Sequence, residues 1–339
     1  MRTYLMYWLV SIFCFSFFAC KHETPDKPEL RNDDVAGQNS GIFVSGSVVR
    51  NGKRNACFWK NDTVQILDGS FAGAALCIFV TDKDILVGGE SDGKPCYWHN
   101  GKKIMINLPG AGAVTGILLN NNIIYAIGYV HEGSVRTRGF LLKGTNVSYL
   151  NAYSGYANDF VFDESDLYIA GADNGRPCYW KNGLPVTLSE RGDVVAIGAA
   201  SEWVMVAGDN RSGVLIGNGI WKNGKFELLD QASRSVRKLK IHDGKVYLLG
   251  NEIIASNKDD VVSNAFIDKD GQLGVLKGEN GNSSTIANDI FISSSSAYVL
   301  GTVTDYETKS QSRICYWIDG KIHFITSEQQ ALGSAIFVR

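Results

Sequence analysis

Proline, histidine and net charge are all scarce in this chain of 339 residues. It holds six Pro and five His, and its 33 Lys and Arg are nearly balanced by 35 Asp and Glu, which leaves a net charge of −2. With 45% hydrophobic residues, this composition excludes a disordered or collagen-like protein. The balanced charge also lacks the broad basic surface that binds nucleic acid, so we expect no nucleic-acid partner.

The sequence signatures of common catalytic and metal sites are missing as well. The seven cysteines include no C-x-x-C pair and no Cys/His spacing typical of zinc. No Gly-rich phosphate loop stands between a strand and a helix, and no nucleophile elbow is found. We therefore predict no metal and no cofactor.

Long hydrophobic runs are absent except at the N-terminus. Arg2 precedes an apolar run over residues 4–18, which ends at Ala19-Cys20. The run is shorter than the roughly 20 apolar residues of a membrane-spanning helix, and we interpret residues 1–19 as a signal peptide. Its end resembles a bacterial lipoprotein signal, which implies that the Cys20 thiol carries the lipid, with acyl chains such as palmitate. Secretory cleavage near Ala19 without lipidation is the alternative.

Residues 20–40 are predicted to tether the folded domain to the membrane. They are polar, contain Pro25 and Pro28, and show no hydrophobic period. Two or more acyl chains make such an attachment stable. The charged stretch behind Cys20 resembles the surface-export signals of Bacteroidota lipoproteins, although it mixes Lys and Glu. The predicted location is the bacterial outer membrane, with surface exposure as one option.

A short strand pattern ending in glycine recurs seven times in the remaining chain. Glycine inside a strand indicates a bulge or the close approach of a neighbouring strand. The repeat glycines are Gly46, Gly89, Gly128, Gly171, Gly208, Gly250 and Gly301. Each is followed by an aromatic position and a tight turn, as in Trp180-Lys181-Asn182-Gly183, and Asn-Gly is a strong hairpin signal. The aromatic position is assigned to Trp59, Trp98, Leu142, Trp180, Trp221, Ile267 and Trp317.

A further apolar stretch precedes every glycine pattern except the first. The missing stretch is found at the C-terminus, over residues 334–338, so the two ends of the chain complete one unit between them. The sequence therefore predicts an all-β fold, a seven-bladed β-propeller over residues 41–339. Its blades have four strands, and the C-terminal strand closes the ring by joining the N-terminal blade. An open β-solenoid or two sandwich domains would not require this closure.

The repeat contains neither a Trp-Asp dipeptide nor a kelch arrangement. Its Trp-Lys-Asn-Gly pattern resembles that of a group of Bacteroidota repeat propeller lipoproteins over residues 41–339. The resemblance implies a propeller fold and an envelope location, and it implies no activity.

Nearly all variation in repeat length falls in one connection of each blade. The interval from the repeat glycine to the aromatic position ranges from 9 residues (Gly89 to Trp98) to 17 (Gly250 to Ile267). This connection joins the second and third strands, so its copies share one face of the ring, where insertions often mark a binding surface. The longest copies are residues 251–263 and 302–313. Neutral drift in solvated loops is the alternative.

Candidate ligand contacts gather on that face. Basic residues just before the third strand suit an anionic ligand such as a uronate or a sulfated glycan; they are Arg54, Lys94, Arg138, Arg176 and Arg313. Tyr129 and Tyr306 are candidates for stacking on sugar rings. His131, beside Glu132, is the one histidine in a variable loop. Carboxylates on the same loops nearly cancel the basic charge, which weakens the interpretation as an anion site, and a solvated surface is the alternative.

Four cysteines occupy equivalent points, two residues before the tryptophan position of four repeats. They are Cys57, Cys96, Cys178 and Cys315. Because each lies on a different blade, we predict free buried thiols rather than a metal cluster or disulfides.

Two functions remain open at this point. The first is a non-enzymatic binding or scaffold module that presents the variable loops to a glycan or an envelope protein. The second is a carbohydrate-active enzyme, a glycoside hydrolase or lyase with two carboxyl groups in the central funnel. The sequence identifies no catalytic pair, and only the fold suggests the second, so we favour the first.

Overall fold

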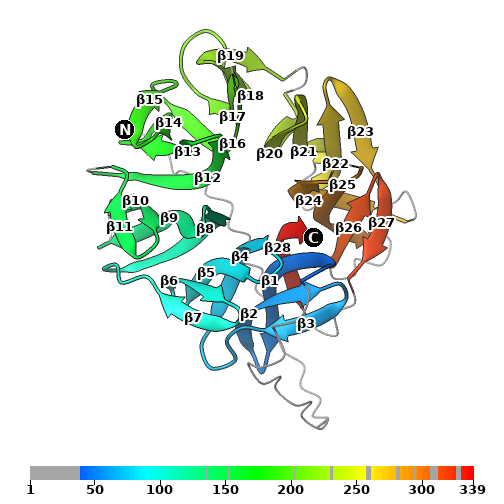
Figure 1. Ribbon diagram of the computed structural model, residues 1–339. Helices are drawn as coiled ribbons and strands as arrows, with labels where there is room; N and C mark the ends of the chain where they lie inside the picture. The colour runs from blue at the N-terminus through cyan, green and yellow to red at the C-terminus, as the bar shows by residue number, and fades with distance from the viewer. Residues whose placement is uncertain are drawn as a thin grey trace, which may run out of the picture.

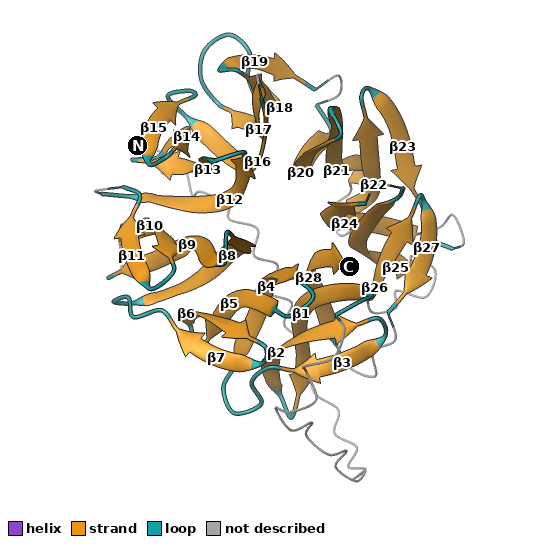
Figure 2. Cartoon of the chain, viewed as in Figure 1, coloured by secondary structure: helices purple, strands orange, loops and turns teal. Residues whose placement is uncertain are grey.

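Seven four-stranded antiparallel sheets surround a central axis in the computed structural model of the chain (Figure 1). The structure describes residues 39–133, 136–151, 153–201, 203–229, 232–256, 261–279, 283–293, 295–305, 312–325 and 330–339. Strands joined by turns and loops make up these ranges (Figure 2). None of them contains a helix long and apolar enough to span a membrane. The predicted seven-bladed β-propeller is confirmed.

The four strands of a blade lie side by side, ordered from the central axis to the outer rim (Figure 1). In blades one to seven the innermost strands are β28 (Ala331–Val338), β4 (Gly73–Val80), β8 (Ala111–Asn120), β12 (Gly155–Asp163), β16 (Gly192–Ala200), β20 (Arg234–His242) and β24 (Ser283–Ile292). The second strands are β1 (Ile42–Arg50), β5 (Ile85–Ser91), β9 (Ile123–Glu132), β13 (Asp166–Asp173), β17 (Trp203–Asn210), β21 (Lys245–Ser256) and β25 (Ala297–Asp305).

The third and fourth strands complete each blade. The third strands are β2 (Lys53–Lys60), β6 (Lys94–His99), β10 (Arg136–Lys143), β14 (Arg176–Lys181), β18 (Gly217–Lys222), β22 (Val261–Lys269) and β26 (Arg313–Ile318). The outermost strands are β3 (Thr63–Ile66), β7 (Lys102–Met105), β11 (Asn146–Tyr149), β15 (Leu184–Thr187), β19 (Lys225–Leu228), β23 (Gln272–Leu276) and β27 (Lys321–Phe324).

The two ends of the folded chain close the ring within blade one. Strand β28 pairs with β1 in antiparallel register, with Val44 opposite Ile336. Gly41 and Arg339 exchange two backbone hydrogen bonds of 2.9 and 3.0 Å at the end of this ladder. Asn39, within the segment predicted as tether, is buried and donates its Nδ2 to the Thr81 carbonyl of blade two at 3.0 Å. The predicted closure by the C-terminal strand is therefore confirmed.

The repeat glycines stand opposite a β-bulge on the innermost strand of every blade. The bulged residues are Leu76, Thr115, Asn158, Val195, Arg237, Asn288 and Ser334. Next to the bulge a backbone carbonyl of the innermost strand lies close to the second strand, and a Cβ on any of the seven glycines would overlap that oxygen. The expected reason for the repeated glycine is thus confirmed, because a bulge and a close backbone approach occur together.

The repeat tryptophans fill the spaces between blades. Trp59, Trp98, Trp180, Trp221 and Trp317 are all at most 1% exposed. Each packs against the blade before its own, as Trp98 does against Phe43 and Phe58 of blade one. Burial of large rings at the blade interfaces supplies much of the hydrophobic stabilisation of the ring.

The sixth repeat departs from its predicted alignment by one residue. Gly250 pairs with Phe266, and Leu248 pairs with Asp268, so Asp268 stands where the other blades carry tryptophan. The assignment of Ile267 to that position was wrong. The ring of Phe266 lies against Gly250, and Phe140 does the same at Gly128 in blade three. In both blades that lack the tryptophan, a phenylalanine directly opposite the glycine occupies the space.

The asparagine of the Trp-Lys-Asn-Gly motif has a defined structural role. Asn182 has a φ of 51°, as the turn requires. Its Oδ1 accepts a hydrogen bond of 2.9 Å from the backbone N–H of Leu167, at the start of the second strand. The same bond is made by Asn61, Asn100, Asn223, Asp270 and Asp319 in their own blades. The turn residue therefore ties the third-to-fourth-strand hairpin to the second strand.

The five cysteines in the described part of the chain are free and buried. They are Cys57, Cys77, Cys96, Cys178 and Cys315. Four of them pair directly with a repeat glycine, as Cys96 does with Gly89. The predicted free buried thiols are confirmed, since residues on separate blades cannot converge on a metal or a disulfide.

Candidate functional site

The connections of variable length lie together on one face of the ring, which we call the variable face. They join the second and third strands, and the connections between blades reach the same face. Among the connections that the structure describes in full, they range from two residues between β1 and β2 to six (211–216) between β17 and β18. Residues 251–263, predicted as a long loop, are for the most part an extension of β21 and β22 beyond the neighbouring hairpins. The variable face thus carries a projecting hairpin on blade six.

The predicted basic residues lie on this face, each on its own blade. Arg176 pairs with Glu190 at 3.1 Å, and Arg313 pairs with Glu279 at 3.2 Å. Arg54 and Lys94 are exposed. A continuous ring of free cations is therefore not formed, because neighbouring carboxylates already neutralise part of it.

Arg138 contacts two side chains of its own blade. Its guanidinium lies 3.3 Å from the centre of the Tyr149 ring and 3.4 Å from Glu132 Oε1. The Tyr149 hydroxyl also donates to Glu132 at 2.9 Å. This half-buried cluster stabilises the β9–β10–β11 sheet, so Arg138 is not a free ligand contact.

Two of the predicted site residues do come together. The rings of Tyr129 and His131 lie 5.1 Å apart on one side of β9. His131 Nδ1 is 2.8 Å from the Thr137 hydroxyl across the hairpin. Glu132 binds arginines instead, so the sequence neighbours His131 and Glu132 do not form an acid–base pair. Cys20 and Tyr306 lie outside the described residues.

Exposed aliphatic side chains are the feature of the variable face that the predicted site did not include. Val214 is 97% exposed in the β17–β18 connection, and Leu215 and Ile216 beside it are also exposed. On the projecting hairpin of blade six, Ile253, Ile254 and Val261 are exposed as well. We call these six residues the aliphatic tips. Their signal in the sequence is an apolar run inside a connection, where polar turn residues are normal.

The central channel holds a group of charged side chains at the level of the bulges. Lys238 Nζ lies 3.9 Å from Asp289 Oδ1 of the next blade. Asp289 Oδ2 accepts the N–H of Ile336 at 2.9 Å, and Asp159 Oδ2 accepts that of Ile197 at 3.2 Å. Each carboxylate therefore links its innermost strand to the next one.

The charge of Lys238 is held by these carboxylates. Burial lowers the pKa of its ammonium, but the nearby Asp159 and Asp289 carboxylates outweigh burial and hold the pKa above its usual value. Lys238 is a stable cation between two acids at neutral pH. Because both acids also bind backbone amides of the next blade, the arrangement is a structural link between blades.

No group of three or more His, Cys, Asp or Glu side chains in the described ranges is placed to hold a metal ion.

Neither a known protein family nor a curated protein matches the chain in sequence. Solved structures with a similar fold include a puromycin-hydrolyzing peptidase of Mycobacterium tuberculosis, with a TM-score of 0.55 and 10% identity, covering 89% of this chain and 55% of that one. The β-propeller domain of the Trilobed protease from Pyrococcus furiosus has a TM-score of 0.55 and 11% identity, covering 86% of this chain and 93% of that domain. An acylaminoacyl peptidase of Pyrococcus horikoshii has a TM-score of 0.52 and 13% identity, covering 84% and 50%.

This chain spans about half the length of the two complete peptidases that it resembles. At such low identity the likeness shows the fold alone. Of the three, the Pyrococcus furiosus structure is itself a β-propeller domain, and the match covers 93% of it.

Proposed function

We propose that the protein is a lipid-anchored binding module of the bacterial envelope that holds a protein partner at its variable face. The aliphatic tips on blades five and six carry this proposal. Exposed clusters of large aliphatic side chains typically mark surfaces that contact proteins or membranes. Sugars are bound through aromatic stacking and hydrogen bonds, for which branched aliphatic tips are poorly suited. A glycan partner is thus the less favoured form of the same binding function.

The charged groups of the variable face fit a protein contact as well. Ion pairs such as Arg176–Glu190 and Arg313–Glu279 stand between blades, where the rim of an interface is usually polar. The two pairs lie on either side of blades five and six, which carry the aliphatic tips, so the apolar surface has charged neighbours along the ring. Envelope location and lipidation at Cys20 are part of the proposal, because the N-terminal segment resembles a lipoprotein signal.

Site-specific photo-crosslinking in the native host tests the proposal. A photoreactive residue at Ile254 or Val214 is expected to yield one defined protein adduct, identified by mass spectrometry. Leu184, 72% exposed on the outer rim of blade four, is the matched apolar control and should yield none. The proposal would be contradicted if Ile254, Val214 and Leu184 all gave the same adduct, or if neither Ile254 nor Val214 gave one.

A combined variant measures the energetic contribution of the tips. The double variant Ile253→Ser, Ile254→Ser should weaken capture of the crosslinked partner by at least about tenfold, because each substitution removes apolar area that the complex would bury. The melting temperature should change little, because both side chains are exposed in the free protein. Glucan and uronan binding measured in parallel distinguishes a glycan partner.

A further inference from the structure

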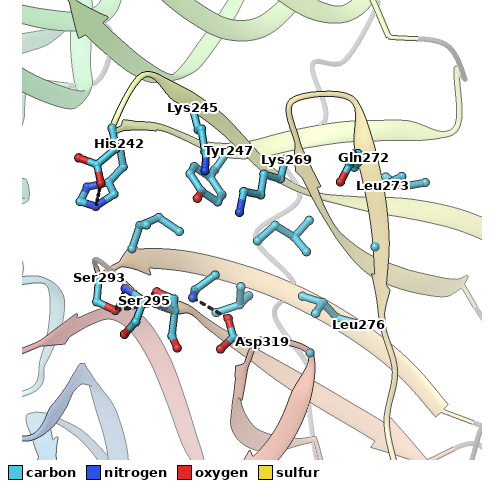
Figure 3. Close-up of a pocket in the computed structure, with 18 residues that line it drawn as sticks. His242, Lys245, Tyr247, Lys269, Gln272, Leu273, Leu276, Ser293, Ser295 and Asp319 are labelled. Carbon is cyan, nitrogen blue, oxygen red and sulfur yellow. Dashed lines mark hydrogen bonds and ion pairs between the residues drawn. The ribbon is translucent and has the colours of Figure 1, made fainter.

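A pocket of about 440 Å³ opens between blades six and seven, on the face opposite the variable loops (Figure 3). Strands β21, β22 and β23 of blade six form one wall, and turns of blade seven form the other. The buried side chains of Leu276 and Val299 line its apolar floor. The volume is in the range of pockets that bind small molecules.

The space of the pocket lies where blade six carries a glycine on its outermost strand, on the surface that faces blade seven. Ile267 pairs with Gly274 across β22 and β23. In every blade the third-strand residue at this position pairs with the residue that precedes the repeat glycine. The equivalent pair on the third and fourth strands is Tyr97 with Ile104 in blade two and Tyr316 with His323 in blade seven. A Cβ on Gly274 would meet only Ile267, at 3.6 Å, and the φ of Gly274 is not in the left-handed region. The backbone therefore does not require glycine there, and its absence of a side chain leaves the space open.

Two lysines stand beside each other on the blade six wall. Lys269 lies across the strand pair from Tyr247, and its Nζ is 5.4 Å from the centre of that ring. Lys245 precedes Tyr247 by two residues on β21 and therefore shares its side of the sheet. Figure 3 shows both ammonium groups on the same side of the pocket as the Tyr247 ring.

In two other blades an aspartate takes the place of Lys245. In blade four, Asp166 stands in the place of Lys245 and pairs with Lys181 at 2.8 Å. In blade two, Asp84 takes that place and lies 2.6 Å from His99. Blade six replaces the acid of this pair by a second cation. Like charges at neighbouring positions destabilise a sheet, so the fold alone gives no reason for Lys245.

The opposite wall presents a hydrogen-bond acceptor. Asp319 of the blade seven turn lines the pocket, and its Oδ1 accepts the N–H of Ala297 at 3.0 Å. Asp243 also lines the pocket and lies 3.5 Å from His242 Nε2. The Asp319 carboxylate thus already accepts one hydrogen bond, but a carboxylate oxygen has further acceptor capacity for a hydroxyl.

We propose that this pocket binds a small organic acid that contains one ring and a hydroxyl group. Its carboxylate binds the ammonium groups of Lys245 and Lys269, its ring lies over the apolar floor beside Tyr247, and its hydroxyl donates to Asp319. A sugar acid and a phenolic acid share this chemistry. The site is separate from the variable face and does not depend on the proposed protein partner.

Saturation-transfer NMR and calorimetry on the purified protein test the site with D-glucuronate and 4-hydroxybenzoate. Glucose and phenol, which lack the carboxylate, are the neutral controls. We expect one of the two acids to bind at millimolar concentration or below, and its neutral counterpart to bind at least about tenfold more weakly. Which acid binds identifies the source of the ring.

Three variants connect binding to this pocket. Lys245→Asp gives blade six the acid–lysine pair that Asp166 and Lys181 form in blade four. It should weaken binding of the acid by at least about tenfold without loss of thermal stability. Gly274→Val fills the space and should have the same effect. Lys143→Gln, at the position in blade three that corresponds to Lys269, is the control and should leave binding unchanged. Absence of binding by both acids, or binding that survives Lys245→Asp and Gly274→Val, would overturn the proposal.

Discussion

Gly46 on the second strand of blade one lies directly against the backbone of Leu332 on the last strand of the chain. A Cβ on Gly46 would overlap the carbonyl oxygen of Leu332. These residues are separated by almost the whole propeller in sequence, and their contact is part of the ladder that closes the ring.

Gly46→Ala should therefore destabilise ring closure. The new methyl group must displace the β28 backbone, and overpacking of this kind costs about 1–3 kcal/mol. Chemical denaturation measures the loss in the free energy of unfolding. Gly69→Ala is the control, because nothing lies within 4 Å of a Cβ at Gly69. Equal stability of the two variants would show that the β28 ladder adapts freely.

Gly144→Asn should stabilise the protein by about 0.5–1.5 kcal/mol, the usual net contribution of one hydrogen bond. Blade three has Gly144 at the turn position where six other blades carry Asn or Asp. The φ of Gly144 is 62°, which asparagine tolerates, and the nearest atom to a Cβ is 3.8 Å away. The new side chain can bind the second strand as Asn182 does. Asn182→Gly is the reciprocal variant and should lose a similar amount in thermal or chemical denaturation.

The buried thiols should be unreactive until the protein unfolds. Burial raises the pKa of Cys77, Cys96 and Cys178 to about 12, from an ordinary value of 9.0. Thiolate is the reactive form, so labelling by iodoacetamide at pH 8 should detect none of the five buried thiols in the native state and all of them in denaturant. Rapid native labelling of any of the five would contradict their placement.

The same thiols predict loss of stability at alkaline pH. Their pKa is higher in the folded state than in the unfolded state, so they remain protonated in the fold while the unfolded chain releases protons. Their contribution to stability is complete below pH 9 and declines as the pH rises toward 12. Replacement of Cys96 by Ala should reduce this decline, as measured by urea denaturation between pH 8 and pH 10.5.

Lys238→Met should destabilise the ring at neutral pH. Without the ammonium, the carboxylates of Asp159 and Asp289 lose the cation that offsets their mutual repulsion. Removing one partner of a buried ion pair costs up to about 3–5 kcal/mol, and this pair is slightly exposed. Because the pKa of Lys238 is raised, its own contribution is present below the ordinary lysine pKa of 10.5 and is lost as the pH rises above it. A difference that does not vary with pH would assign Lys238 a packing role.

Several features of the fold followed from the sequence because they are repeated. One glycine and one Asn-Gly turn say little, but seven copies at a regular spacing predicted the blades, and the strand missing from the first copy predicted the closure. The alignment failed in blade six, where Ile267 was taken for the tryptophan position. An acidic residue, Asp268, occupies that position. Its apolar neighbour Ile267 fits the expected hydrophobic pattern better, so the sequence alone pointed to the wrong residue.

The candidate sites depended on contacts that a linear pattern does not contain. Arg138 has the same place in its repeat as Arg176, but only the fold shows that Arg138 lies on the Tyr149 ring and is bound by Glu132. The pocket beside Lys245 lies where Gly274 stands opposite Ile267, at a position where other blades carry a larger side chain. The sequence by itself determined the repeat, the number of blades and the face that varies, because these depend on periodic local signals. The tertiary structure decided which charges are neutralised and where space remains, because both depend on packing between residues far apart in the chain.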